Sequence, residues 1–520
     1  MSHREDTPSE PAPSRASAGR RRGLAASLAP ADALGRTAAK LRGLLGASRE
    51  RHREDALGLA EYKLVSALGE AGCPICATSR DNDRRYFSWL LIEGYSDPGV
   101  LDEFARALGF CAGHARYAIT ECSAHGQLGT LHAAAVGQLR RRFADDRRRR
   151  AWEGEVDAAG GRPQPCPACR ADAETVRRTA FFLANLIERG RDRGRYGAPG
   201  LLCLPHLRLT APYLTDPTLG RLLARHEAAL GEAVAGRRSG ARRPHTHDRE
   251  ADAAALRLAV GHPPALEDWP PSYSARAPAR HGDAVATLVT DLRGAHCPVC
   301  LEVVRAGADW GAWLDEAARK GETVSDLLPG CPRHLWASHQ RAGPALAAAL
   351  VDQALGGAHY AVAFALAKLR ERPPAPELRR PVEALGRLLE GRRPLIRLAR
   401  GALGRPPGCP LCRRLAVARD RTLGLLAALL ETPRHRTDYE NGHGLCLDHF
   451  ARLIALDPPP AVRAFLYDAQ GAKLAVLGWD LGELSRKSAW QWRPEPRGRE
   501  QASPRRALAR FSGLLDLAAE

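Results

Sequence analysis

The chain has 520 residues, more than the roughly 100 to 200 of one typical domain, which predicts several packed units. Arg interrupts every long apolar run, so no stretch of the sequence approaches the roughly 18 apolar residues that a membrane-spanning helix needs, and we expect no membrane partner. Lys and Arg exceed Asp and Glu by 77 to 59, a net charge of +18. Such an excess can indicate nucleic acid or an anionic surface as a partner. The Arg, Ala, Gly and Pro that crowd the chain are also typical of a GC-rich genome, so the charge alone does not establish either.

The first 50 residues are predicted to form a disordered tail and a lead-in helix. The segment Met1 to Arg22 is rich in Ser, Pro and Arg. The apolar run that follows Arg22 is weak, and Pro30 and Asp32 interrupt it. We interpret it as a tail rather than a secretion signal, and we expect a cytoplasmic protein.

Cysteine spacing reveals a repeat with four copies. Thirteen cysteines placed at random would give roughly 0.3 Cys-x-x-Cys pairs, and the chain has four. They are Cys73-Pro-Ile-Cys76, Cys166-Pro-Ala-Cys169, Cys297-Pro-Val-Cys300 and Cys409-Pro-Leu-Cys412. Each is followed, after 34, 33, 30 and 33 residues, by one Cys-x-x-His: Cys111 with His114, Cys203 with His206, Cys331 with His334, and Cys446 with His449. We expect each pair to share one ion with the Cys-x-x-His that follows it.

The Pro of each Cys-Pro-x-Cys is expected to restrain the turn that aims both sulfurs at one ion, and a helix is predicted after each motif. Thirteen residues after the second Cys, all four copies have a large apolar residue: Trp89, Phe182, Trp313 and Leu425. The next position is Leu in every copy: Leu90, Leu183, Leu314 and Leu426. In the first copy, Ser96-Asp97-Pro98 ends this helix and a second, shorter helix follows. A Gly lies close before each third Cys, which suits a tight turn at the metal.

The repeat predicts an all-α fold with four tandem zinc-stapled helical units in two pairs. The predicted boundaries are 51–150 for unit 1, 151–236 for unit 2, 237–283 for a linker rich in Pro, Arg and His, 284–372 for unit 3, 373–492 for unit 4, and 493–520 for a polar C-terminal tail. This tail is predicted to end in a short amphipathic helix, Leu508 to Leu517. The basic segment 140–150 is predicted to be a joint between units 1 and 2.

Three thiolates and one imidazole form a closed tetrahedral shell, which is typical of structural zinc. We therefore expect about four zinc ions per chain. An iron–sulfur cluster also accepts Cys and His ligands, and Cys-Pro-x-Cys alone resembles the redox turn of glutaredoxin-like proteins, although that turn needs a βαβ setting. Covalent haem is excluded because no His directly follows any Cys-x-x-Cys.

Two residues compete with the assigned ligands. Cys122 is the thirteenth cysteine and forms a second Cys-x-x-His with His125. Choosing it would lengthen the first gap and lose the Gly-Phe before Cys111, so we assign Cys111 to the metal and expect Cys122 to be a buried free thiol on the helix beyond. His443, three residues before Cys446, is interpreted as a loop residue.

Unit 1, with the sequence GCPICATSRDNDRRYFSWLLIEGYSDPGVLDEFARALGFCAGH, resembles a bacterial zinc-binding domain family of unknown function. Members of that family carry Cys-Pro-x-Cys, an aromatic-Leu helix, an Asp-Pro break and Gly-Phe/Leu-Cys-x-x-His. Unit 4 resembles it as well, unit 2 more loosely, and unit 3 least, because GCPRH lacks the apolar residue before Cys331. The resemblance implies helices and zinc, and implies no activity.

The leading hypothesis is an intracellular scaffold or protein-interaction module that binds protein partners. A nucleic-acid-binding protein using Arg-rich surfaces is the alternative, with weak and sequence-independent binding expected. A zinc-thiolate redox sensor is third. No catalytic arrangement is recognised in the sequence, so we favour a protein that is not an enzyme.

Overall fold

The computed structural model describes residues 72–120, 125–189, 201–240, 249–262, 279–371, 408–492 and 494–513, together with Leu64, Ala67, Leu68, Cys122 and Leu403. All belong to one compact unit, Ala60–Glu520. The regular elements of these residues are eighteen α-helices and five short 3₁₀ turns, without a strand, and the predicted all-α fold is confirmed for them. The tail and lead-in helix predicted for residues 1–50 lie outside the described residues. None of the described helices has the length and apolar character that crossing a membrane requires.

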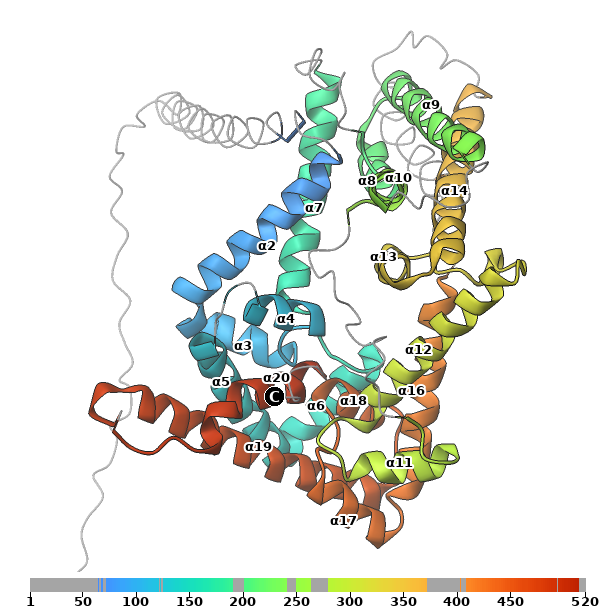
Figure 1. The fold of residues 1–520 in the computed structure, drawn as a ribbon. Coiled ribbons are helices and arrows are strands. Elements are labelled where there is room, and N and C mark those ends of the chain that lie inside the picture. The colour runs from blue at the N-terminus through green and yellow to red at the C-terminus, as the bar shows by residue number, and fades with distance from the viewer. Residues whose placement is uncertain are drawn as a thin grey trace, which may run out of the picture. The chain divides into compact units, whose positions relative to one another are not determined.

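The elements follow one another along the chain in the order shown in Figure 1. They are α2 (Pro74–Ile92), η1 (Gly94–Ser96), α3 (Pro98–Arg106), α4 (Ala112–Thr120), α5 (His125–Ala144), α6 (Asp146–Ala159), α7 (Pro167–Glu188), α8 (Leu204–Thr210), η2 (Ala211–Tyr213), α9 (Asp216–Gly240), α10 (Arg249–Val260), α11 (Ala284–Leu292), α12 (Pro298–Arg319), η3 (Ser325–Leu327), α13 (Pro332–Arg341), α14 (Pro344–Arg370), α16 (Pro410–Leu429), α17 (Pro433–Asn441), α18 (Leu447–Ala455), α19 (Pro460–Ser488), η4 (Trp490–Trp492), η5 (Arg499–Ala502) and α20 (Ser503–Ser512).

The predicted helix after each Cys-Pro-x-Cys is present, and it begins within the motif, where the sequence had predicted a turn. In α2, α7, α12 and α16 the first Cys is the N-cap and Pro is the first helical residue, where its missing N–H costs nothing and its fixed φ suits the helix. The repeated Leu fourteen residues after the second Cys is buried in every copy. The residue before it lies at the margin of the core, and Trp89 and Trp313 are each 45% exposed. The shared Leu is therefore the core residue of the repeat.

Helices α2 and α7 lie side by side (Figure 1), and so do α12 and α16. Across the first pair, Ser79 Oγ donates to Asp172 at 2.6 Å and Thr175 Oγ1 donates to Asn82 at 2.8 Å. Each bond joins residues 93 apart, which is also the separation of Cys73 from Cys166. Equivalent positions of two repeats therefore meet, as expected for a local two-fold relation.

The long helices that follow the Cys-x-x-His motifs make a second kind of contact. Helix α5 of unit 1 packs along α19 of unit 4, and α9 of unit 2 packs along α14 of unit 3. Together with the pairs α2 with α7 and α12 with α16, these contacts link the units in the order 1, 2, 3, 4 and back to 1 (Figure 1). Each unit thus contacts at least two others, and units 2 and 4 also meet, where Arg452 donates to the Gly160 carbonyl at 3.2 Å.

Each of the two large apolar cores surrounds one of these contacts between long helices, α5 with α19 and α9 with α14. One contains Phe104 and Leu128 from unit 1 together with Phe450 from unit 4. The other contains Leu223 from unit 2 and Leu355 from unit 3. Because burial of apolar side chains is the main favourable term in folding, these cores join the first half of the chain to the second.

The segment 237–283, predicted to be a linker, contains a packed helix. Helix α9 continues to Gly240, and α10 occupies Arg249–Val260. Leu256 and Ala259 of α10 are buried in the second core. The abundance of Arg and Pro around α10 masked its apolar face in the sequence.

The segment 493–520, predicted to be a polar tail, also differs from the prediction. Helix α20 begins at Ser503, earlier than the amphipathic helix expected there, and buries Leu508 and Phe511 completely. Fully buried Asp480 of α19 holds this segment, because Arg499 donates to its carboxylate at 2.9 Å and Arg506 forms an ion pair with it at 2.9 Å. Residues 514–520 lie outside the described residues. The basic segment 140–150, predicted to be a joint, is the end of α5 and the start of α6.

Candidate metal centres

The structure gathers the sixteen predicted ligands into four clusters, but with different partners from those expected. The clusters are Cys73, Cys76, Cys203 and His206; Cys111, His114, Cys166 and Cys169; Cys297, Cys300, Cys446 and His449; and Cys331, His334, Cys409 and Cys412. We call them clusters A, B, C and D in that order. Each Cys-Pro-x-Cys therefore shares a cluster with the Cys-x-x-His of its neighbour, and the expectation of one self-contained site per copy was wrong.

The exchange has a simple geometric reason. Cys73 is the N-cap of α2, which has 19 residues. At a rise of about 1.5 Å per residue, the end of this helix lies about 28 Å from Cys73. Helix α3, with nine residues, is too short to return Cys111 to that point. Asp83 of α2 instead lies at cluster B, beside the start of α7. The two helices are therefore antiparallel, and the start of each is brought to the Cys-x-x-His of the other unit.

Every cluster is built where two helices begin. Cys73 is the N-cap of α2 and Cys76 is its third residue, while Cys203 is the N-cap of α8 and His206 is its third residue. Clusters C and D follow the same scheme, and Cys111 directly precedes α4. Helix N-termini carry partial positive charge and favour anionic groups, so this placement stabilises thiolates.

The spacing within the clusters fits a four-coordinate ion. The atoms Cys76 Sγ and Cys203 Sγ are 3.7 Å apart in cluster A, and the corresponding sulfur pairs are 3.7, 3.8 and 3.8 Å apart in clusters B, C and D. A tetrahedral ion with metal–sulfur bonds of about 2.3 Å and metal–nitrogen bonds of about 2.0 Å requires sulfurs about 3.8 Å apart and sulfur to nitrogen about 3.6 Å. The Nδ1 atom of His206 lies 3.2 to 3.3 Å from three sulfurs. None of the thirteen cysteines, all of which lie in the described part of the chain, forms a disulfide.

Cluster B has a carboxylate behind its histidine. Asp83 Oδ1 lies 3.4 Å from His114 Nε2, and both side chains are buried. Burial alone would lower the pKa of His114, but Asp83 and the sulfurs of Cys111 and Cys166 outweigh it and raise that pKa to about 12. Asp83 and the sulfurs thus favour a positive charge between them, at the position of the His114 imidazole. A carboxylate on the far nitrogen of a ligating imidazole is typical of metal sites, where it fixes the ring orientation.

Two glycines that were not predicted as site residues cover clusters A and C. Gly261 follows α10 with φ +88°, and a Cβ there would lie 3.0 Å from Cys203 Sγ and 3.1 Å from Cys76 Sγ. Gly513 follows α20 with φ +69°, and a Cβ there would lie 2.8 Å from Cys300 Sγ. The sequence contained one signal that the two glycines are equivalent. Gly261 lies five residues after Leu256, and Gly513 lies five residues after Leu508; both leucines are buried on helices.

The four clusters differ in exposure. All four ligands of cluster C are buried, whereas cluster D contains Cys412, the single exposed ligand among the sixteen. Cys331 of cluster D is half-buried. Cluster D is therefore the most accessible to reagents in solution.

The two competing residues lie outside the clusters. Cys122 is half-buried and belongs to none of the four groups. His443 is also outside them, and its backbone N–H donates to the Gly294 carbonyl at 2.8 Å. His443 lies outside the helices, as expected of a loop residue, whereas Cys122 is half-buried between α4 and α5 rather than buried on a helix.

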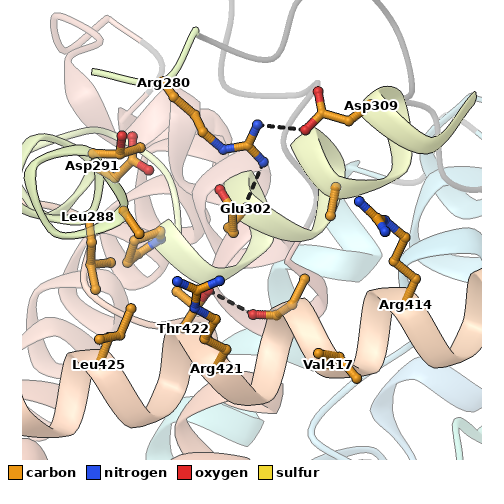
Figure 2. Close-up of a pocket in the computed structure, with 15 residues that line it drawn as sticks. Arg280, Leu288, Asp291, Glu302, Asp309, Arg414, Val417, Arg421, Thr422 and Leu425 are labelled. Atoms are coloured by element: carbon orange, nitrogen blue, oxygen red, sulfur yellow. Dashed lines mark hydrogen bonds and ion pairs between the residues drawn. The ribbon is translucent and has the colours of Figure 1, made fainter. Parts of the chain in front are cut away.

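A cavity of about 460 Å³ lies between α11, α12 and α16 (Figure 2). Arg280 donates there to Glu302 at 2.8 Å and to Asp309 at 2.5 Å. Asp291 accepts from buried Arg305 at 2.5 and 2.9 Å. None of the sixteen cluster residues lines this cavity, so it is separate from the candidate metal centres.

No family model, curated protein or solved structure matches the chain. The candidate function therefore rests on the clusters. Each contains three sulfurs and one imidazole nitrogen, and these ligands come from helix starts of two units.

Proposed function

We propose that the chain is a cytoplasmic zinc-binding scaffold in which four structural Zn²⁺ ions cross-link neighbouring helical units. The observation that carries this proposal is the ligand geometry, with sulfur pairs 3.7 to 3.8 Å apart in all four clusters. Zinc suits three thiolates and one imidazole and has no redox chemistry of its own. A shell closed by four protein ligands leaves no position for a substrate, which favours a structural role.

Reciprocal exchange of ligands makes each ion a cross-link between two units. Clusters A and B both join units 1 and 2, and clusters C and D both join units 3 and 4. Structural zinc contributes about 10 to 16 kcal/mol in small zinc-finger peptides, whereas whole proteins are stable by about 5 to 15 kcal/mol. Metal binding is therefore expected to decide whether each pair of units folds.

Exposed aromatic side chains support a role in binding other proteins. Trp490 is 77% exposed and Trp479 is 61% exposed, and both lie on the α19–η4 part of the chain. Tryptophan is enriched at the energetic centres of protein interfaces. We propose protein partners for this surface.

Metal analysis of the purified full-length chain tests the zinc assignment. The proposal predicts close to four zinc per chain, and replacement by Co²⁺ should give the visible spectrum of tetrahedral cobalt thiolate. Two or fewer zinc after metal-replete expression would reject four equivalent sites. A brown protein that contains iron would favour the iron–sulfur alternative.

A pull-down from the native host, with and without nuclease, tests the scaffold role. The proposal predicts protein partners that remain after nuclease treatment and are lost when Trp479 and Trp490 are replaced by Ala. Replacement of Trp89, which is exposed on α2, provides a matched control. Loss of all partners on nuclease treatment would favour the nucleic-acid alternative instead.

A further inference from the structure

A second cavity lies between α5 and α6, on the Arg-rich segment that the metal clusters do not use. Its volume is about 400 Å³. Its polar lining consists of Arg141, Arg142, Arg148, Gln138, Glu155 and the indole of Trp152. The lining thus contains three arginines and one acidic residue.

The other acidic residues of this segment are engaged elsewhere. Asp145 is the N-cap of α6, where its carboxylate accepts from the Arg148 backbone N–H at 2.8 Å. Asp146 pairs with Arg149 at 2.5 Å. Arg141, Arg142 and Arg148 have no side-chain ion pair with any described residue, which leaves the cavity with an excess of positive charge.

Two buried donors at the cavity lack a partner. Trp152 is 1% exposed, and no described group accepts from its Nε1–H. Arg142 Nη1 is also buried and without an acceptor in the described part of the chain. Burial lowers the pKa of Arg142 from its ordinary value, against the opposing effect of Glu155. A buried N–H without an acceptor is unfavourable, and more so when the group is charged, so an acceptor in the cavity would be favourable.

We propose that this cavity binds a phosphoryl group. The oxygen atoms of a phosphate dianion can accept from the Trp152 indole N–H, from Arg142 Nη1 and from the more exposed Arg141 and Arg148 together. Arginine is suited to this role because its planar guanidinium donates two parallel hydrogen bonds to phosphate. The phosphoryl group can belong to inorganic phosphate, to a phosphomonoester or to a nucleic-acid strand, and the chemistry is the same in each.

Indole NMR combined with calorimetry tests the proposal on the full-length chain, in buffer free of phosphate and sulfate. The protein is labelled with ¹⁵N at tryptophan, and the Trp152 Nε1–H resonance is assigned by its loss in Trp152→Phe. Inorganic phosphate, phosphoserine and a single-stranded oligonucleotide are titrated in separate arms. The variants are Arg142→Gln and, as a matched control, Arg147→Gln, which removes an exposed arginine of α6 outside the cavity lining.

Phosphate is expected to shift the Trp152 indole resonance and to bind with millimolar affinity or better. Arg142→Gln should weaken this binding about tenfold or more, because a charge-assisted hydrogen bond is lost, whereas Arg147→Gln should change it by less than about twofold. If the oligonucleotide competes with phosphate and responds to Arg142→Gln in the same way, the site takes the phosphates of a strand. If only the two small ligands respond, the ligand is a small phosphate. Absence of an indole shift at 50 mM phosphate, or equal effects of both variants, would overturn the proposal.

Discussion

Cys76 and Cys203 are separated by 127 positions in the chain, yet their Sγ atoms are 3.7 Å apart. The same exchange occurs between Cys169 and Cys111, whose sulfurs are also 3.7 Å apart. An ion in either cluster therefore joins two units rather than stabilising one. The stability of each unit is expected to depend on ligands that its neighbour supplies.

Asp83→Asn is expected to weaken metal retention in cluster B. The carboxylate of Asp83 lies behind His114, and loss of such a partner typically costs 10 to 100-fold in metal affinity, as an order-of-magnitude estimate. Competition with a chelator measures the effect, with one zinc per chain released at lower chelator concentration than the rest. Asp81→Asn is the control, because Asp81 forms an exposed pair with Arg85 on the same helix. Equal release from both variants would mean that Asp83 does not position the imidazole.

Gly513→Ala is expected to disturb cluster C. The new Cβ would lie 2.8 Å from Cys300 Sγ, closer than a Cβ can approach, so α20 or the ligand must move. Gly160→Ala is the control because Gly160 also has a positive φ, +62°, while its Cβ would meet nothing within 4 Å. Both variants carry backbone strain of about 1 to 2 kcal/mol, and Gly513→Ala should lose about 1 to 3 kcal/mol more. Thermal unfolding and zinc content together measure the difference, and equal losses would contradict the placement of Gly513 over the cluster.

The pH dependence of stability should contain a contribution from His132. This imidazole is fully buried and donates through Nδ1 to the Leu128 carbonyl at 2.6 Å. Burial lowers its pKa from 6.5 to about 4, although the Leu128 bond opposes the shift. The unfolded chain therefore binds a proton that the folded chain does not, and stability is lost as pH falls from about 6.5 towards about 4, by up to about 1.4 kcal/mol per pH unit.

His132→Gln removes this titration, so its denaturation midpoint should fall less steeply than that of the wild type between pH 6.5 and 4.5. Acid release of metal affects both proteins, and their difference isolates the histidine. Parallel curves for the two proteins would show that His132 is protonated in the folded state as readily as in the unfolded chain.

Cluster D is expected to be the first site to react with hydrogen peroxide. Cys412 is exposed, and its Sγ lies 3.8 Å from that of Cys331. The two thiolates give two electrons to the peroxide: the S–S bond forms, the O–O bond breaks, and two protons from solvent complete two water molecules. An ion in cluster D would lose two of its four ligands and be released. One zinc per chain should be released early, and a Cys331–Cys412 disulfide should appear in peptide mass spectra. Cluster C, whose ligands are all buried, is the internal control, and its release before cluster D would contradict the exposure argument.

The spacing of residues in the sequence was sufficient to predict the local features of this fold. The large apolar residues Trp89 and Leu90, with Tyr86 and Phe87 one turn earlier, predict a helix after the first motif, because helical spacing is a signal within one element. The same reasoning selected the sixteen residues that the structure gathers into clusters. The Cys-x-x-His that shares a cluster with each Cys-Pro-x-Cys could not be predicted this way. The number of residues between two motifs, 34 or fewer, does not show in which direction the intervening helix runs. Helix α10 was not predicted, because its buried residues Leu256 and Ala259 lie among charged residues and prolines in the sequence.

Alkylation of the Cys111→Ser variant tests the exchange of ligands most directly. The full-length variant, expressed with zinc, is treated with iodoacetamide under native conditions, and the reactivity of each cysteine is measured by peptide mass spectrometry. Cys122→Ser, treated in the same way, controls for loss of a cysteine outside the clusters. The exchanged arrangement predicts that Cys166 and Cys169 become reactive in Cys111→Ser while Cys73 and Cys76 stay protected. Reactive Cys73 and Cys76 with protected Cys166 and Cys169 would contradict it.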